Sequence, residues 1–169
     1  MTRVRLCILF LALLVGVSLC FAQTSKNKRH TTGARAQHIV TTPDQIKWGP
    51  PPPGLPAGSE IAVLSGDPSK AGVSFTIRAR MPDGYKIPPH WHPTDENVTV
   101  VQGMLMIGMG DKFDESAGSE LPTGSYALMP KSVRHFAWAK GETIIDVYGI
   151  GPFAITYVNP SDDPRRKAK

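Results

Sequence analysis

Residues 84–103, GYKIPPHWHPTDENVTVVQG, carry the pattern that decides the fold. His90 and His92 are two residues apart, so both imidazoles point to the same side of an extended strand. Glu96 follows the bend expected at Pro93 and adds a carboxylate, a hard oxygen ligand that complements two nitrogen ligands on one divalent ion. This stretch therefore predicts three ligands of a metal site, with a fourth to come from elsewhere in the chain.

The rest of the chain predicts an all-β fold. Apolar and polar residues alternate from Gly72 to Met81, which is typical of a strand with one buried face. Further short runs are separated by glycine and proline, and none predicts a helix longer than a turn. Besides the His90 segment, strands are expected at residues 60–64, 72–81, 98–101, 104–109, 125–129, 133–139, 143–148 and 153–158, with a short edge strand at 46–48. Many short strands at nearly even spacing predict one domain, a sandwich or a barrel.

His135 is the candidate for the fourth ligand, because it is the remaining histidine of the strand-forming body. An antiparallel barrel can bring its strand beside the His90 strand, so that His90, His92, Glu96 and His135 converge on one interior point. Each histidine alone would more often be a hydrogen-bonded core or surface residue. Together they predict a site for a divalent transition metal, and nitrogen and oxygen ligands leave manganese, iron, nickel, copper and zinc open.

Two spaced motifs resemble those of the cupin superfamily. The first superfamily motif is matched at every spacing by Gly84, His90, His92, Glu96 and Gly103. The second is matched by Gly124, Pro130 and His135. Ser132 stands where this motif has its second glycine, and Ala139 stands where it has its asparagine.

The resemblance implies a double-stranded β-helix, a jelly-roll cupin barrel of one domain, similar to secreted and bacterial single-domain members. It also implies that His90, His92, Glu96 and His135 hold the metal inside the mouth of the barrel. The same scaffold hosts oxygenases, isomerases, decarboxylases and binding proteins, so the resemblance leaves the reaction open.

The N-terminal residues have the layout of a secretory signal peptide. Residues 1–5 are basic, residues 6–19 are almost wholly apolar, and Ala22 ends a small-residue cleavage site. A retained membrane anchor is the alternative, but the apolar run is shorter than the roughly 20 residues of a spanning helix; a lipoprotein start at Cys20 is a weaker one. Cleavage after Ala22 predicts a secreted or periplasmic protein without stable membrane insertion. It also removes both cysteines, so no disulfide is expected.

Basic residues are concentrated at the two ends of the mature chain. Residues 23–42 are polar and predict a disordered basic leader, and residues 161–169 predict a flexible basic tail. Residues 41–160 contain nine Lys or Arg against twelve Asp or Glu, a net charge of −3, and the barrel is expected over 43–160. This distribution argues against a nucleic-acid-binding groove.

Two loops are expected to be structural. Residues 49–56 are rich in proline and predict a stiff loop around the barrel, although such runs can also be ligands of partner domains. Residues 110–118 contain three acids and predict a solvated loop or one helical turn, only loosely similar to a calcium loop.

Strand alternation predicts what surrounds the metal. Val98, Val100, Leu105 and Ile107 are expected to line an apolar cavity, and a small-molecule ligand or substrate is the expected partner.

The same alternation places other apolar and aromatic residues outside the barrel. Met104 and Met106 fall on the outer face, where they suggest a homodimer interface. Arg134, Phe136 and Trp138 also point away from the cavity.

Three functions are compatible with these residues. The first is a metal-dependent oxygenase for a small organic molecule, of dioxygenase type, in which Glu96 serves as a ligand and a candidate proton carrier. The second is a non-catalytic module that binds metal or a small ligand in the cell envelope. The third, a sugar isomerase or epimerase, needs a further base, for which Tyr126 is the one weak candidate. In each case histidine ligands bind as neutral groups, so metal affinity is expected to fall below about pH 6.

Overall fold

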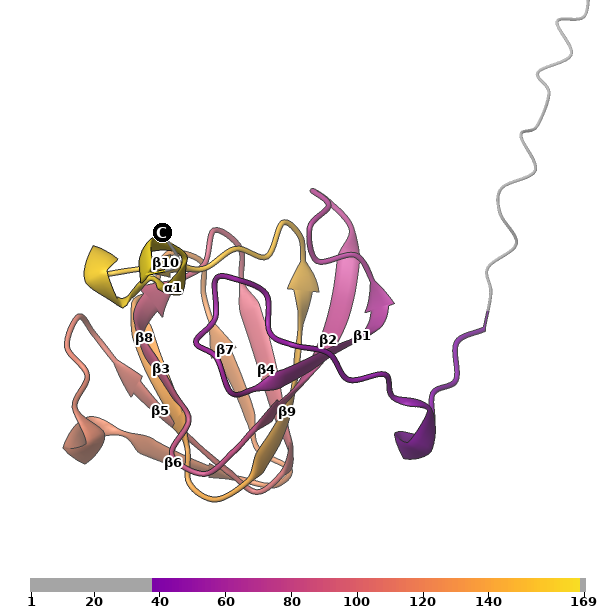
Figure 1. The fold of residues 1–169 in the computed structure, drawn as a ribbon, viewed down its shortest axis with the longest axis horizontal. Coiled ribbons are helices and arrows are strands. Elements are labelled where there is room, and N and C mark those ends of the chain that lie inside the picture. The colour runs from indigo at the N-terminus through magenta and orange to yellow at the C-terminus, as the bar shows by residue number, and fades with distance from the viewer. Residues whose placement is uncertain (1–37, 168–169) are drawn as a thin grey trace, which may run out of the picture. The chain divides into compact units, whose positions relative to one another are not determined.

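The computed structural model describes residues 38–167. In it, ten strands form two five-stranded antiparallel sheets that face each other (Figure 1). The first sheet has the order β1-β2-β9-β4-β7, and the second has the order β10-β3-β8-β5-β6. The strands are β1 Glu60–Gly66, β2 Ser74–Met81, β3 Lys86–Trp91, β4 Glu96–Gln102, β5 Met104–Met109, β6 Ser119–Pro122, β7 Tyr126–Met129, β8 His135–Ala139, β9 Thr143–Ile150 and β10 Thr156–Tyr157. This arrangement confirms the predicted all-β jelly-roll fold.

Helical structure is confined to single turns among the described residues. These are the 3-10 helices η1 Pro43–Gln45, η2 Glu115–Ala117 and η3 Pro160–Asp162, and the α-helix α1 Pro164–Lys167. Residues 110–118 thus combine a loop with one turn, η2, as expected. No helix within residues 38–167 has the length and apolar character to cross a membrane. The predicted signal peptide and most of the basic leader lie outside the described residues.

The core fills the space between the inner faces of the two sheets. In β2 the residues Phe75, Ile77, Ala79 and Met81 are all buried, as the alternation predicted. From the facing sheet, Leu105 is 1% exposed, and each such apolar side chain contributes roughly 1.5–3 kcal/mol when it is fully buried. The core therefore aligns the inward positions of both sheets, which include the predicted metal ligands.

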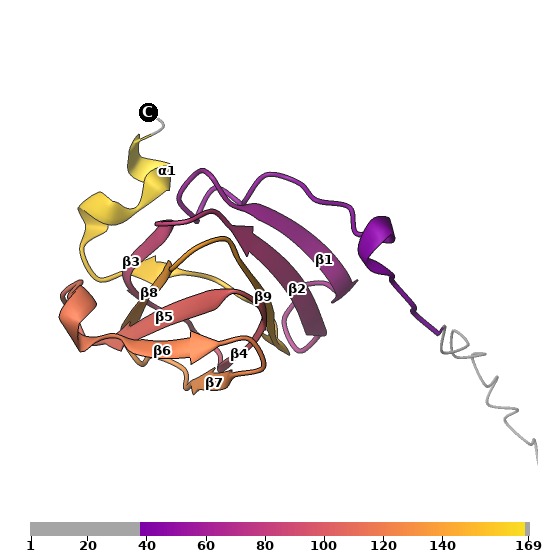
Figure 2. The same ribbon diagram turned by 90° about the horizontal axis from the view of Figure 1, so that it is seen from below.

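Some strand limits differ from the expectation. Residues 46–48 form no strand, and Gly49 makes an isolated bridge to Ile61. The prolines from Pro50 onward lack the backbone donors that would extend this bridge into a ladder. The expected strand at 153–158 is reduced to the two residues of β10. Strand β6 was not expected, since its one leucine lies among polar residues and a proline; the strand lies at the edge of the sheet beside β5 (Figure 2).

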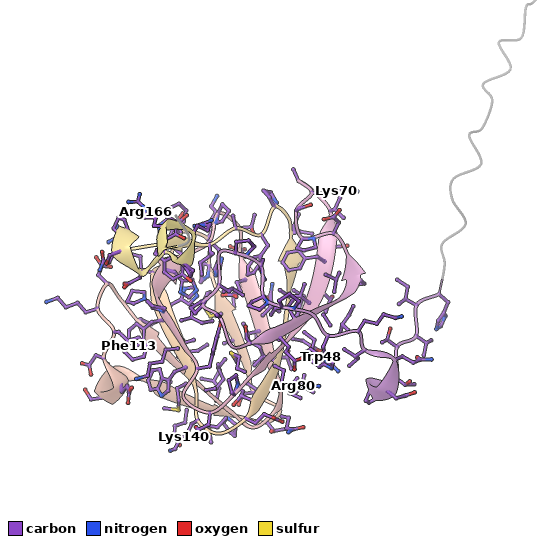
Figure 3. The ribbon with its side chains drawn as sticks, in the orientation of Figure 1. Trp48, Lys70, Arg80, Phe113, Lys140 and Arg166 are labelled. Carbon is purple, nitrogen blue, oxygen red and sulfur yellow. The ribbon has the colours of Figure 1, made fainter. Side chains whose placement is uncertain are left out.

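The proline-rich loop is tied to the barrel by two tyrosines. The Tyr85 hydroxyl donates to the carbonyl oxygen of Pro56 at 2.7 Å, and the Tyr157 hydroxyl donates to that of Gly54 at 2.8 Å. Just before this loop, the guanidinium of Arg80 lies 4.2 Å from the ring centre of Trp48 (Figure 3). These contacts support a structural role for residues 49–56.

The outer face of the second sheet carries a second apolar cluster. Met106, Phe136 and Trp138 are buried there, and Met104 and Phe113 pack against them (Figure 3 labels Phe113). Phe113 belongs to the loop after β5 and covers the outward stripe that suggested a homodimer. The stripe is thus packed against a loop of the same chain, which strand alternation could not show. The homodimer itself stays a prediction.

The basic C-terminal segment, for which a flexible tail was expected, forms η3 and α1 up to residue 167. Arg165 pairs with Asp163 and donates to the carbonyl oxygen of Ile155 at 3.1 Å. The segment thereby contacts the chain just before β10.

Candidate metal centre

Strands β3, β4 and β8 bring the four predicted residues together. His90 lies in β3 directly opposite His135, the first residue of β8. His92 follows β3, and Glu96 is the first residue of β4. The register of β3 shifts between Ile87 and His90, where two prolines cannot donate ladder hydrogen bonds.

The cluster is compact and buried. One ligand atom from each of the four residues lies within 4.8 Å of the other three. The four side chains are nearly sealed from solvent, because no residue of the cluster is more than 8% exposed. His90, His92, Glu96 and His135 can thus address a single ion.

Each imidazole is oriented by a backbone carbonyl. The Nδ1 atoms of His90 and His92 lie 2.8 Å from the carbonyl oxygens of Pro88 and Ala154, and Nδ1 of His135 lies 3.1 Å from that of Val133. A carbonyl oxygen can only accept, so Nδ1 carries the proton in each ring. The Nε2 atom of a neutral ring is then left with a free lone pair.

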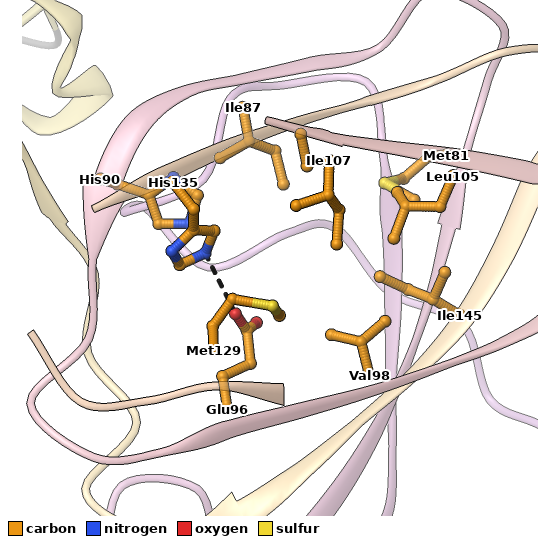
Figure 4. Close-up of a pocket in the computed structure, with 11 residues that line it drawn as sticks. Met81, Ile87, His90, Glu96, Val98, Leu105, Ile107, Met129, His135 and Ile145 are labelled. Atoms are coloured by element: carbon orange, nitrogen blue, oxygen red, sulfur yellow. Dashed lines mark ion pairs between the residues drawn. The ribbon is translucent and has the colours of Figure 1, made fainter. Parts of the chain in front are cut away.

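These Nε2 atoms are the feature that fits a cation. Nε2 of His92 is buried and has no hydrogen-bond partner. Nε2 of His135 and of His92 lie 3.2 and 3.4 Å from the Glu96 carboxylate (Figure 4 draws the contact of His135). Buried lone pairs facing a carboxylate are costly unless a positive charge lies among them. Three nitrogens and one oxygen are donors that suit a divalent transition metal.

The Glu96 carboxylate is held in its ionised form. Burial raises its pKa, but when His135 and His92 carry a proton on the Nε2 that faces the carboxylate, their hydrogen bonds and positive charge outweigh burial and hold the pKa of Glu96 well below its usual range. A low pKa suits a metal ligand, because the group does not need to lose a proton before it binds.

Burial has the largest effect on His90. Burial, together with smaller effects of the same sign from the neighbouring His135 and His92, lowers the pKa of His90 to about 3. The loss of metal that we expected near pH 6 therefore does not apply to this ligand. His90 stays neutral, and able to bind a metal, down to far more acidic solutions.

A small cavity adjoins the cluster on its core side. Its volume is about 30 Å³, and His90, Glu96 and His135 form its polar wall (Figure 4). The remaining lining is apolar and comes from Met81, Ile87, Val98, Leu105, Ile107, Met129, Ala137 and Ile145. Of the four residues predicted to line it, Val98, Leu105 and Ile107 do so, and Val100 is buried in the core beside them.

The aromatic candidates lie outside the cavity. Phe136 and Trp138 point to the outer cluster, as strand alternation predicted, and Arg134 pairs with Asp111 at the surface. Tyr126 is 57% exposed, and its hydroxyl donates to the side-chain oxygen of Asn97 at 2.7 Å. The base that a sugar isomerase would need is therefore not supplied by Tyr126.

Sequence reasoning missed two residues that support the cluster. Ala154 supplies the carbonyl for His92, and the ring of Phe153 stacks on the same imidazole. Both lie more than 60 positions from His92, in a stretch that was expected to be an ordinary strand. No motif marks a backbone carbonyl, so only the chain path could reveal these contacts.

Solved structures of similar fold include several cupins. The polyketide cyclase RemF from Streptomyces resistomycificus has a TM-score of 0.62 and 17% identity, covering 78% of this chain and 93% of that one. A putative acetylacetone dioxygenase from Methylibium petroleiphilum has a TM-score of 0.58 and 19% identity, covering 78% and 88%. An RmlC-like cupin from Shewanella frigidimarina has a TM-score of 0.52 and 17% identity, covering 69% and 93%. At sequence identities of 17–19%, the similarity to these structures supports the fold alone.

The family is established by the sequence comparison. No curated protein matches this chain at a significant level. The family described as the ChrR cupin-like domain matches residues 36–154, a range that includes both motifs and all four residues of the cluster. On that match, over most of its length, the chain belongs to the ChrR cupin-like domain family of the cupins.

Proposed function

We propose that this protein is a metal-dependent oxygenase of dioxygenase type that acts on a small organic molecule. The observation that carries the proposal is the buried cluster of three inward Nε2 atoms and one carboxylate beside an apolar cavity. Four protein ligands leave one or two positions open on a divalent ion. In a dioxygenase both atoms of dioxygen enter the product, so no external reductant is needed.

The metal would be held by His90, His92, Glu96 and His135, and it would supply a Lewis acid and a site for oxygen chemistry. The protein's own contribution is orientation and exclusion of water. Backbone carbonyls hold the three imidazoles in one tautomer, and the apolar wall keeps bulk water from the reacting atoms.

The chemistry of the cavity wall favours this function over a sugar isomerase. Its lining offers no polar side chain other than the three residues of the cluster. The hydroxyl groups of a sugar brought against this wall would be buried without partners, at a cost of roughly 1–3 kcal/mol each. A substrate whose polar atoms bind the metal needs no further polar partners in the wall, and neither does dioxygen.

Glu96 is proposed first as a metal ligand and second as the group that carries a proton. Its lowered pKa makes it a weak proton acceptor, which supports the first role more than the second. The Glu96→Gln variant separates the two roles. If metal is retained while turnover is lost, the proton-carrying role is supported; loss of metal supports the ligand role alone.

The test begins with elemental analysis of protein purified without added metal. The metal-free protein is then reconstituted with each divalent ion in turn. Oxygen consumption is measured with phenols, diketones and sulfur compounds, and the His92→Ala variant serves as the control. We expect consumption that depends on both metal and substrate. Consumption at the level of His92→Ala with every ion and substrate class would reject the oxygenase.

A non-catalytic module that binds metal or a small ligand is the second candidate. It is favoured by the absence, among the described lining residues, of any acid or base outside the cluster. This candidate predicts tight retention of the metal or ligand and no product. Mass spectrometry of the small molecules released from the purified protein distinguishes the two.

We also propose that the protein is exported, on the strength of the signal-peptide pattern in residues 1–22. Fractionation of producing cells and N-terminal sequencing test this. Export predicts a mature chain that begins at Gln23, and an intact Met1 in the cytoplasmic fraction would reject it.

A further inference from the structure

The cavity beside the cluster is much smaller than an aromatic ring requires. Its volume is about 30 Å³, whereas an apolar cavity that holds benzene measures roughly 150 Å³, and one water needs about 10–15 Å³. The space therefore accommodates about two or three non-hydrogen atoms. This is the size class of dioxygen.

The cavity cannot grow toward the core without breaking the packing. Met81 and Leu105, at the end of the cavity away from the cluster, are each 1% exposed (Figure 4). Ile107 and Ile145 lie in β5 and β9, strands that are paired on both sides. Interiors of this density resist displacement of a side chain by even one methylene group.

Met129 differs from these four residues in its place in the sheet. It ends the four-residue strand β7, which within residues 38–167 is an edge strand whose one partner is β4. Met129 lies directly opposite Glu96 in that ladder, so the two side chains share one face and are neighbours (Figure 4). Methionine is unbranched and flexible, so its side chain can move where branched residues cannot.

We infer that the cavity is a size-selective ligand site and that Met129 sets its limit. A ligand of dioxygen size reaches the open position on the metal directly, and a molecule of ring size reaches it only after Met129 has moved. The inference rests on the metal centre of the proposed function. It does not require turnover.

The experiment uses the Co²⁺-loaded full chain and two probes of different size. Azide is a linear ion of three atoms, and imidazole is a five-membered ring; binding of either to Co²⁺ changes the visible spectrum. Titrations compare the wild type with Met129→Ala, which removes Cγ, Sδ and Cε, and with Met129→Leu, which keeps a large side chain. Leu128→Ala is the matched control, because Leu128 is the outward neighbour on the same strand and is 49% exposed.

In the wild type, in Met129→Leu and in Leu128→Ala, we expect azide to bind and imidazole to bind weakly or not at all. In Met129→Ala we expect imidazole binding to strengthen by at least about tenfold while azide binding changes little. Wild-type protein that binds both probes equally well, or neither, overturns the inference. So does a Met129→Ala variant that gains no affinity for imidazole.

The outcome is separable from the test of the proposed function. Size selection without oxygen consumption keeps the inference and rejects the oxygenase. Oxygen consumption without size selection supports the oxygenase and rejects the inference. Failure of the wild type to take up any metal rejects both.

Discussion

The imidazole of His92 stacks on the ring of Phe153, with ring centres 4.5 Å apart and ring planes inclined by 16°. The next residue, Ala154, accepts the hydrogen bond from Nδ1 of the same imidazole. The Phe153 ring packs in turn against Phe75 of the core, 5.1 Å away. The segment between β9 and β10 therefore orients the His92 imidazole, a candidate metal ligand, through two contacts. One is the stacked ring on the face of the imidazole, and the other is the hydrogen bond at Nδ1.

Replacing Phe153 with alanine should weaken metal binding without removing a ligand. Loss of the stacked ring frees the His92 imidazole, and loss of an orienting partner typically costs about 10-fold to 100-fold in metal affinity. Competition with a chelator of known affinity measures the effect. Phe113→Ala is the matched control, because it also removes a packed phenylalanine but from the outer cluster. Equal affinities of the two variants would show that Phe153 does not position His92.

Metal should stabilise the folded protein through the cluster alone. A ligand at 100 times its dissociation constant stabilises the native state by about 2.7 kcal/mol, provided that the unfolded chain does not bind it. We expect the thermal midpoint of the wild type to rise with added metal and to fall again with chelator. His135→Ala should show neither change, whereas His38→Ala should behave like the wild type because His38 is exposed and outside the cluster. A rise in His135→Ala of wild-type size would place the binding site elsewhere.

Acid should destabilise the metal-free protein through His90. Its pKa is about 3 in the folded state and near 6.5 in the unfolded chain. Between these values the unfolded state binds a proton that the folded state does not, so the free energy of unfolding falls as pH falls from about 6.5 to 3. The slope contributed by this group is at most about 1.4 kcal/mol per pH unit.

Urea denaturation at several pH values tests this expectation. The His90→Asn variant should lose that part of the slope, while His38→Asn should keep it. Parallel pH profiles for the wild type and His90→Asn would contradict the lowered pKa of His90.

Replacing Ser132 with glycine should stabilise the fold. Ser132 stands where the second cupin motif has a glycine, and it is the one described non-glycine residue with a positive φ, at 65°. A side chain in this left-handed region costs about 1 kcal/mol or more, and glycine removes the cost. We expect Ser132→Gly to raise the free energy of unfolding by up to about 1 kcal/mol in chemical denaturation.

Ser119→Gly is the control for this substitution, because Ser119 lies in strand β6 with no positive φ. At this position glycine only increases the conformational entropy of the unfolded chain. Ser119→Gly should therefore lower the free energy of unfolding by roughly 0.5–1 kcal/mol. If both variants are destabilised alike, Ser132 carries no backbone strain.

The sequence by itself determined the fold class and the set of candidate ligands. Strand alternation identified the buried face of β2, because side chains point to opposite faces with a period of two. The spacing from Gly84 to Gly103 predicted three candidate ligands, and both glycines have positive φ, a conformation that most other residues avoid. His135 could be chosen because it was the remaining histidine of the barrel.

Only the tertiary structure decided what surrounds those ligands. The carbonyl of Ala154, the ring of Phe153 and the side chain of Met129 come from other segments, and their contacts depend on the path of the chain rather than on any local pattern. The same holds for Phe113, which folds over the outer sheet and covers the methionines that suggested a dimer. The periodicity of a strand predicts to which face each side chain points. Which residues contact that side chain depends on long-range packing.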